Sequence, residues 1–149
     1  MSSLWRSRGE LSLAEEKYEE AWTWASRSLE AATQCRQRKH AARALRLQGD
    51  ILAAQGRLED AARVLTASLD QARVLGAARE SWIGQAALGR ALTRLGRDTE
   101  AEAQLTAAAQ TIELIATKLV TPPLRRSFLA AGPVADVFRA LGRTPPGSG

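Results

Sequence analysis

Residues 49–69, GDILAAQGRLEDAARVLTASL, match residues 89–109, GRALTRLGRDTEAEAQLTAAA, at a distance of forty positions. Glycine, alanine and leucine recur at equivalent places in both stretches. The segment GELSLAEEKYEEAWTWASRSL at 9–29 is a third, more divergent copy in the same register. Self-similarity at a fixed period of this size indicates a repeat array in which each unit is one supersecondary structure. We therefore predict three units, 2–41, 42–81 and 82–121, followed by a tail.

Each unit is predicted to form two antiparallel helices. In the middle unit, apolar and small residues follow helical spacing from Leu45 onward and again from Ala61 onward. Gly56 lies between the two runs and supplies the left-handed residue that ends a helix, and Gly76 ends the second run. Gly49 and Ala61 are expected where the two helices approach most closely, because larger side chains would push the axes apart.

The composition favours an all-α fold. The chain of 149 residues has 29 Ala and 20 Leu but only 9 Val and Ile together, and strands need β-branched and aromatic residues. All five prolines lie in the last 28 residues. The preceding 121 residues, rich in Ala, Leu, Arg and Glu, are therefore predicted to form helix after helix.

The order of glycine, acidic, alanine and small residues resembles the tetratricopeptide repeat. Unit two carries the pattern most completely, in Leu45, Gly49, Leu52, Gly56, Leu58, Glu59, Ala61, Leu65 and Ser68. The period of forty is longer than the usual repeat of about 34 residues and is similar to the variant found in bacterial signalling ATPases, kinases and transcription activators. Glu16 departs from the pattern, because it replaces the glycine that ends the first helix. The resemblance implies an α-solenoid of three antiparallel hairpins that serves as a non-catalytic protein–protein interaction scaffold in a bacterial regulatory or signalling protein.

The tail is predicted to close the array. Its residues 122–142 should form two short capping helices, since Pro122 and Pro123 suit a helix start and a solenoid needs cover over its last exposed face. The side chains expected to point inward are Leu124, Phe128, Leu129, Val134, Val137, Phe138 and Leu141. Residues 143–149 contain no core residue and are expected to be a disordered tail.

The sequence contains no constellation of residues for catalysis, a metal or a cofactor. It has one histidine, His40, and one cysteine, Cys35, and neither a phosphate-binding loop nor a dinucleotide fingerprint. Cys35 aligns with Leu75 and Ile115, which favours a packing role, whereas His40 opens a helix and is expected to be exposed. The chain is therefore predicted not to be an enzyme and to need no cofactor.

The chain is expected to be cytoplasmic. No apolar run approaches the ~20 residues that cross a bilayer, so no membrane is expected as a partner. The N-terminus has no signal-peptide core, and a single cysteine excludes an intramolecular disulfide.

The concave side of the array is the predicted binding site. In this repeat geometry the first helix of each pair lines that side, and both Arg46 and Arg90 are expected to be exposed on it. The predicted groove residues are Arg6, Arg43, Arg46, Asp50, Arg90 and Arg94. Guanidinium groups pair well with carboxylates, so an acidic segment of a protein or peptide is the expected ligand. The alternative is a solvated polar face with no dedicated ligand.

Trp22 and Trp24 are candidate interface aromatics. They align with mixed residues in the other units, so at least one indole is expected to be partly exposed. Such an indole either covers the terminal repeat or forms a contact surface, for which tryptophan is favoured. Self-association through the terminal repeats is therefore a further hypothesis.

Nucleic acid is the alternative partner class, and the less favoured one. The formal charge is +5, and the excess lies mainly in the tail, at Arg125, Arg126, Arg139 and Arg143. Four arginines could contact phosphates, but few aromatic residues accompany them and no helix suited to reading bases is evident.

Overall fold

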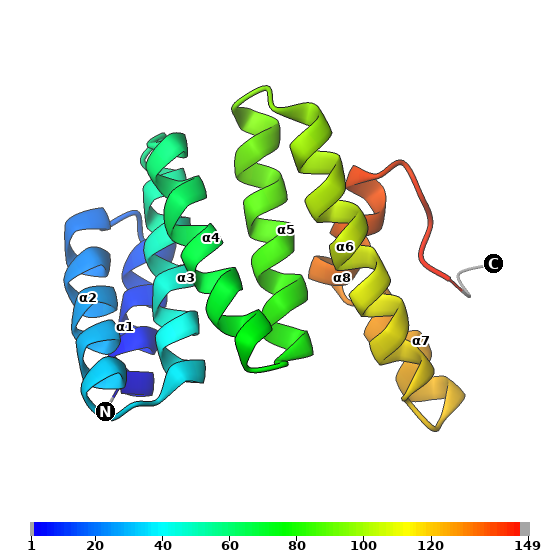
Figure 1. Ribbon diagram of the computed structural model, residues 1–149, viewed down its shortest axis with the longest axis horizontal. Helices are drawn as coiled ribbons and strands as arrows, with labels where there is room; N and C mark the ends of the chain where they lie inside the picture. The colour runs from blue at the N-terminus through cyan, green and yellow to red at the C-terminus, as the bar shows by residue number, and fades with distance from the viewer. Residues whose placement is uncertain (1, 147–149) are drawn as a thin grey trace.

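The computed structural model describes residues 2–146. Within this range the chain forms eight α-helices and no strand, which Figure 1 follows from blue to red. The helices are α1 (Ser2–Ala14), α2 (Tyr18–Gln34), α3 (Arg38–Ala54), α4 (Leu58–Val74), α5 (Ala78–Arg94), α6 (Asp98–Thr117), α7 (Pro122–Ala130) and α8 (Gly132–Ala140). The prediction of an all-α fold is confirmed.

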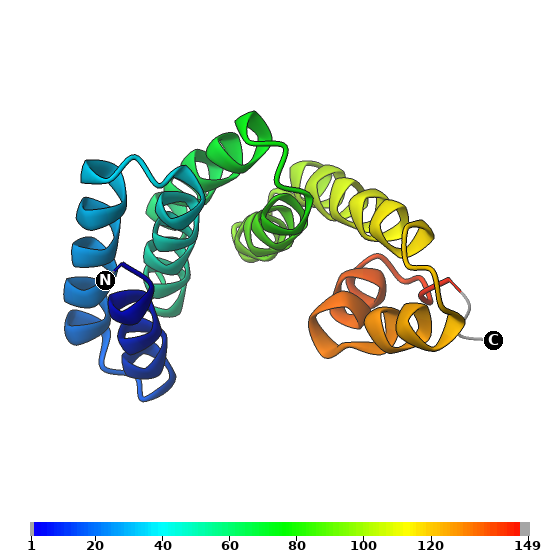
Figure 2. The ribbon, with the colours of Figure 1, turned by 90° about the horizontal axis from the view of Figure 1, so that it is seen from below.

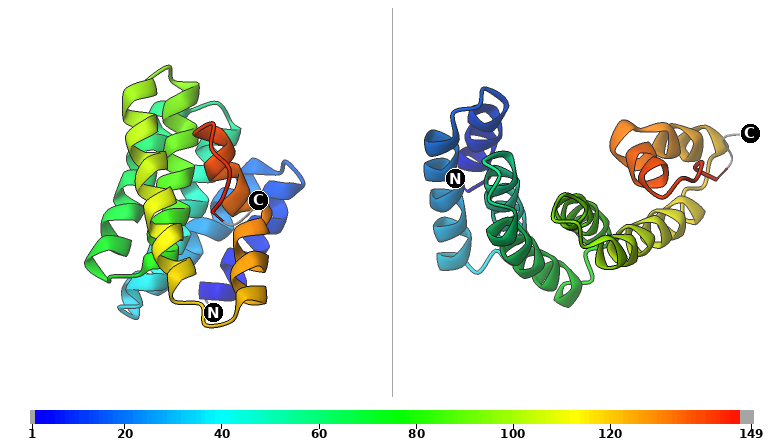
Figure 3. Two further views of the ribbon diagram at one scale, coloured as in Figure 1. Left: turned by 90° about the vertical axis from the view of Figure 1, so that its right-hand side faces the viewer. Right: turned by 90° about the horizontal axis from the view of Figure 1, so that it is seen from above.

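The first six helices pair into three antiparallel hairpins, α1–α2, α3–α4 and α5–α6. Neighbouring hairpins pack through α2 on α3 and through α4 on α5, and α3 also contacts both α1 and α5. Figure 2 shows that the array is curved, with α1, α3 and α5 on its inner side and α2, α4 and α6 on its outer side. The opposite view in Figure 3 shows the same curvature. The predicted α-solenoid is confirmed.

The chain turns at a left-handed residue every twenty positions. These residues have φ between 55° and 79° and are Glu16, Arg36, Gly56, Gly76 and Gly96. At Gly56 the turn is closed by two backbone bonds, from the amide of Gly56 to the carbonyl of Ala53 and from that of Arg57 to Leu52. The expected unit boundaries at 41/42 and 81/82 fall inside the first turns of α3 and α5. The repeat in the sequence gives the length of a unit but not its phase, and the loops at 35–37 and 75–77 divide the hairpins.

Glycine should stabilise the two turns that lack it. We expect Glu16→Gly and Arg36→Gly each to raise the free energy of unfolding by about 0.5–1 kcal/mol. The steric cost of a side chain on left-handed backbone is larger than the extra conformational entropy that glycine loses on folding. Both side chains are exposed, so little else is lost. Urea unfolding measures the effect. The control is Gln55→Gly: the backbone of Gln55 is right-handed, so glycine at this position should lower the free energy of unfolding. Glycine variants less stable than wild type at both turns would contradict the expectation.

A glycine in the first helix of a hairpin lets the second helix approach closely. A Cβ added to Gly49 would lie 2.5 Å from Cγ of Leu65, and one added to Gly89 would lie 2.8 Å from Cγ of Leu105. Ala61, on the facing helix, is fully buried. The close approach predicted at Gly49 and Ala61 is therefore observed.

The helices α7 and α8 cover the last face of the array, where they lie under α6 in Figure 2. Phe138 is fully buried in one cluster with Trp82 of α5 and Ile112 of α6. Of the other side chains predicted to point inward, those buried or partly buried are Phe128, Leu129, Val134, Val137 and Leu141. The prediction is wrong for Leu124, which is 58% exposed. It lies in the exposed first part of α7, and only the end of that helix reaches the core.

Arginines hold the two ends of this cap. Arg125 donates to the carbonyls of Ala116 and Leu119, at 3.1 and 3.0 Å, and so closes the corner between α6 and α7. Arg143 pairs with Glu113 at 3.1 Å, and its guanidinium lies over the ring of Phe138. The expected disordered tail therefore does not begin at Arg143. Residues 147–149 of that tail lie outside the described residues.

Candidate functional site

The predicted groove residues all come from the three inner helices. Arg6 lies on α1, Arg43, Arg46 and Asp50 on α3, and Arg90 and Arg94 on α5. The helical pattern sets this placement, because residues three and four positions apart share one face of a helix. The three helices lie side by side on the inner side of the arc in Figure 2, with α3 in contact with the other two.

Two of the predicted groove arginines are bound to a carboxylate that no sequence pattern indicated. The side chain of Glu80, in the first turn of α5, is only 1% exposed. Its Oε1 accepts hydrogen bonds from Nε and Nη2 of Arg43, at 3.1 and 2.9 Å, and its Oε2 accepts one from Nη1 of Arg46, at 3.0 Å. These bonds join α3 to α5 across the junction of the second and third hairpins. Arg46 is therefore half-buried and paired, which corrects the expectation that it is exposed on the concave side.

The environment of Glu80 favours its charged form. Burial by itself would raise the pKa of Glu80, but the hydrogen bonds from Arg43 and Arg46 outweigh burial and hold that pKa below its ordinary value. The carboxylate therefore stays ionised at neutral pH and neutralises part of the arginine charge on this face.

Asp50 lies on α3, the middle one of the three inner helices, within electrostatic reach of charges on all three. Burial raises its pKa, the charges of Arg46 and Arg90 lower it, and the charge of Glu10 raises it again, with a net upward shift. The exposed Arg90 on α5 therefore lies within electrostatic range of Asp50 on α3.

Arg6 and Arg94 also have partners within the chain. Arg6 pairs with Glu10 one turn along α1, at 2.5 Å. Arg94 is exposed and donates to the carbonyl of Ala53 on α3, at 2.9 Å. With Glu80 included, five arginines face three carboxylates across the inner helices. The face therefore keeps an excess of positive charge, and it is concentrated at the exposed Arg90 and Arg94 on α5.

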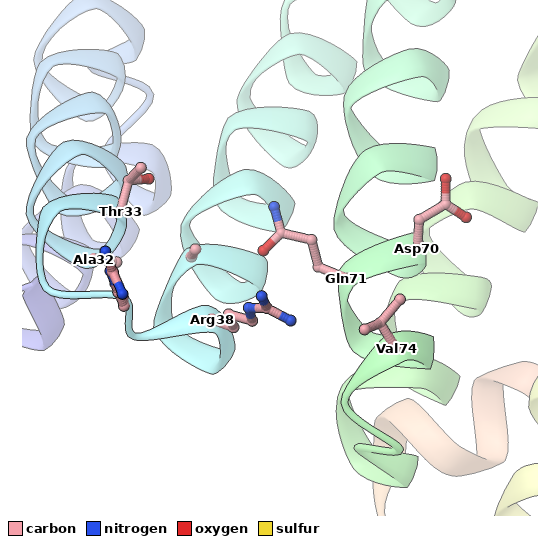
Figure 4. Close-up of a pocket in the computed structure, with 8 residues that line it drawn as sticks. Ala32, Thr33, Arg38, Asp70, Gln71 and Val74 are labelled. Atoms are coloured by element: carbon pink, nitrogen blue, oxygen red, sulfur yellow. The ribbon is translucent and has the colours of Figure 1, made fainter.

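A separate cleft of about 590 Å³ lies where the ends of α2 and α4 meet the start of α3. Figure 4 shows the side chains of Arg38 and Gln71 converging on it, whereas Asp70 points away. Ala32 and Val74 contribute apolar surface to its wall. No pattern in the sequence marks this cleft, because its residues come from three helix ends that share no spacing along the chain.

The two candidate interface aromatics differ in exposure. Trp22 is 38% exposed, which agrees with the expectation that one indole is partly uncovered. Trp24 is partly buried beneath the guanidinium groups of Arg8 and Arg27, at 5.0 and 5.2 Å from its ring centroid. Trp24 is therefore covered by side chains of its own hairpin.

The lone cysteine and histidine lie apart from any cluster of ligands. Cys35 is exposed, so the predicted packing role is wrong: it lies at the C-cap of α2, beyond the last turn that faces the core. His40 is half-buried instead of exposed. Between residues 2 and 146, no group of three or more His, Cys, Asp or Glu side chains is arranged to hold a metal ion.

The basic residues of the tail are mostly engaged within the protein. Arg125 closes the α6–α7 corner, Arg139 pairs with Asp136 at 2.6 Å, and Arg143 pairs with Glu113. Arginines that already have partners on their own chain have less to offer a phosphate backbone.

The comparisons with known proteins concern the fold. No protein-family profile and no curated protein sequence matches the chain. The crystal structure of the apo form of RapI, an α-solenoid with TPR-like helical repeats, superposes with a TM-score of 0.72 at 13% identity. The match covers 95% of this chain and 49% of the RapI chain, so the chain spans about half the length of RapI. At this low identity the likeness shows the fold alone: the chain has the α-solenoid architecture of a helical repeat protein.

Proposed function

We propose that the chain is a non-catalytic protein–protein interaction scaffold whose inner groove binds an acidic segment of a partner. The observation that carries the proposal is the excess of arginine over carboxylate on three successive inner helices. Guanidinium groups recognise carboxylates with two parallel hydrogen bonds, which suits an acidic peptide laid across the groove.

The positions of the arginines assign them different roles in this proposal. Arg43 and Arg46 are held by Glu80 and shape the groove. Arg90 and Arg94 are exposed on α5 and are the side chains that a ligand reaches first. Asp50 beside Arg90 opposes an acidic ligand least when it is protonated, and its raised pKa favours that state.

The wider role is proposed on the architecture and on the resemblance of the repeat. Helical arrays of this kind present extended concave surfaces to partners, and the forty-residue period is similar to that of repeats in bacterial signalling ATPases, kinases and transcription activators. We place the chain in a regulatory or signalling protein of the cytoplasm. None of the helices within residues 2–146 combines the length and the apolar character needed to cross a bilayer.

Peptide binding tests the groove. We expect a fluorescently labelled peptide of alternating glutamate and leucine to bind with a Kd of about micromolar, and the affinity to fall as salt rises. Arg90→Glu should weaken binding by at least about tenfold, because reversal of the charge repels the ligand's carboxylates. Fluorescence anisotropy measures both effects. The same peptide with lysine in place of glutamate should not bind.

The matched control is Arg126→Glu, an exposed arginine on α7, a helix whose main contacts are with α6 and α8. Its binding of the acidic peptide should equal that of wild type. If Arg90→Glu and wild type bind the acidic peptide with equal affinity, the groove hypothesis is wrong. Binding of duplex DNA that is lost in Arg126→Glu and kept in Arg90→Glu would support the nucleic-acid alternative instead. Arg46 is unsuitable for this test, because its reversal would break the pair with Glu80.

A further inference from the structure

The cleft of about 590 Å³ between α2, α3 and α4 is lined by two arginines that have no partner within the described chain. Arg36 lies in the loop before α3, and Arg38 is the first residue of that helix. Both residues are exposed, and within residues 2–146 neither guanidinium has a hydrogen bond or an ion pair. The arginines that link helices, such as Arg43 and Arg125, are bound to acceptors. Arg36 and Arg38 therefore leave their donors available to a ligand.

The repeat shows that the fold does not need an arginine at either position. Forty residues later, at the next junction between hairpins, Gly76 takes the place of Arg36 and Ala78 takes the place of Arg38. Arg36 also has a left-handed backbone, with φ of 55°, a conformation that glycine adopts at lower cost. A strained residue without a partner does not stabilise the array, whereas strain of this kind is found at functional sites. The two arginines are therefore better explained by binding than by folding.

The charge of the cleft is positive. Among the described residues that line it, the acidic one is Asp70, whose Oδ1 lies 4.0 Å from Nη1 of Arg73 and which points away from the cleft (Figure 4). Arg38, by contrast, extends from α3 toward the α4 wall in the same view. The start of α3 borders the cleft, so the positive end of its helix dipole adds to the charge of the two guanidinium groups. The cleft is therefore suited to an anion.

Two unpaired guanidinium groups match the charge of a phosphate monoester. Such a group carries about −1.5 to −2 charges at neutral pH and has three terminal oxygens, so it can accept parallel hydrogen bonds from each of two arginines. A carboxylate has a single charge and two oxygens, which would leave part of the arginine charge uncompensated. A phosphate monoester is therefore the anion that best fits Arg36 and Arg38 together.

The other walls of the cleft indicate what kind of molecule carries the phosphate. Ala32, Ala41 and Val74 provide apolar surface, and the amide of Gln71 can bond a polar substituent. The described residues that line the cleft include no aromatic side chain, so a nucleotide base would find no ring on which to stack. The volume of about 590 Å³ lies in the range of small-molecule sites, roughly 300–1,000 Å³. These features favour a small aliphatic body.

We propose that this cleft binds a small aliphatic phosphate monoester, with Arg36 and Arg38 holding the phosphate and Val74 contacting the aliphatic body. None of the predicted groove residues lines the cleft. The site is therefore distinct from the inner groove, and its test is independent of peptide binding there.

Titration with n-butyl phosphate, followed in amide correlation NMR spectra, tests the site. We expect a Kd of about 1 mM or below at low salt, with the largest shifts at residues 36–41 and 70–74, which include most of the lining residues. Inorganic phosphate, which lacks the aliphatic body, and pentanoate, which lacks the second charge, should each bind at least about threefold more weakly.

Three results would overturn the proposal. The first is the absence of shifts at these residues up to about 10 mM n-butyl phosphate. The second is equal binding of n-butyl phosphate and pentanoate. The third is a glycine-flanked phosphoserine peptide that binds at least about tenfold more tightly than n-butyl phosphate, because the cleft would then recognise a protein segment and not a small molecule.

Arg36→Gly separates phosphate binding from the stability of the fold. This variant should bind n-butyl phosphate at least about tenfold more weakly than wild type, although it is expected to be more stable. Glu16→Gly makes the same kind of change at another left-handed turn and should keep wild-type affinity. Arg38→Gln should also lose at least about tenfold, whereas Arg126→Gln, at an exposed arginine on α7, should lose less than about twofold. Wild-type affinity in either Arg36→Gly or Arg38→Gln would show that the arginines do not hold the phosphate.

Discussion

Gly49→Leu is expected to lower the free energy of unfolding by about 3 kcal/mol or more. A Cβ at this position would already lie 2.5 Å from Cγ and Cδ2 of Leu65, and the rest of a leucine side chain has no space between α3 and α4. Leu65 is 1% exposed in the core and cannot move aside without displacing its neighbours. Overpacked helix contacts of this kind cost about 1–3 kcal/mol and sometimes more. Thermal unfolding should show a midpoint about 10 °C below that of wild type.

The chain offers a matched control for this change. A Cβ added to Gly84, on the inner helix of the next hairpin, would lie 3.7 Å from Cδ1 of Leu69, which is ordinary contact. Gly84→Ala should therefore gain up to about 1 kcal/mol from helix propensity, whereas Gly49→Ala should lose stability. Equal effects of alanine at the two glycines would contradict the close approach of α3 and α4.

Glu80→Gln is expected to lower the free energy of unfolding by about 3 kcal/mol at neutral pH. The substitution keeps the shape of the side chain but leaves Arg43 and Arg46 without their shared carboxylate. Removing one partner of a buried ion pair costs about 3–5 kcal/mol, and the partial exposure of both arginines puts the expected loss at the lower end. Glu102→Gln, at an exposed carboxylate on α6, should change stability by less than about 0.5 kcal/mol. If the two variants unfold at the same urea concentration, the bridge does not stabilise the fold.

The pH dependence of unfolding separates Glu80 from Asp50. The pKa of Glu80 is lower in the folded chain than in the unfolded one, so its contribution is complete above the unfolded value of about 4.3 and is lost as the pH falls through the folded pKa. The difference in the free energy of unfolding between wild type and Glu80→Gln should therefore become smaller as the pH falls. The pKa of Asp50 is raised by folding, so its charged form opposes folding at neutral pH and protonation relieves the penalty. Asp50→Asn should be at least as stable as wild type at neutral pH. Any gain in the free energy of unfolding over wild type should disappear in acid, where Asp50 itself is protonated. A larger difference in the free energy of unfolding between wild type and Glu80→Gln at low pH than at neutral pH would contradict this account.

Local pattern determined most of the architecture. The forty-residue repeat predicted three hairpins because each helix buries one stripe, and that stripe leaves a spacing of small and apolar residues along the chain. Gly56, Gly76 and Gly96 mark helix ends because a left-handed turn favours glycine, and the same register places Glu16 at an equivalent turn without one. Cap residues such as Val134 and Phe138 could be predicted from helical spacing alone.

The partners of the predicted groove residues could not be predicted from local pattern. The sequence placed Arg43 and Arg46 on the first helix of the second hairpin, where the structure has them, but it did not indicate their partner Glu80, which stands 34–37 positions later. An acidic residue in the first turn of a helix has the same local pattern whether it is solvated or buried. The packing of α3 against α5 decides between the two outcomes.

The sequence by itself determined the all-α hairpin array, its period, most of its helix ends and the side of each helix that faces the core. All of these depend on residues within a few turns of one another. Only the tertiary structure decided that Glu80 is buried between two arginines and that Cys35 and Leu124 are exposed. The physical reason is that burial at a junction depends on the angle and register between neighbouring hairpins, and these are set by the summed packing of many side chains instead of by any one spacing in the chain.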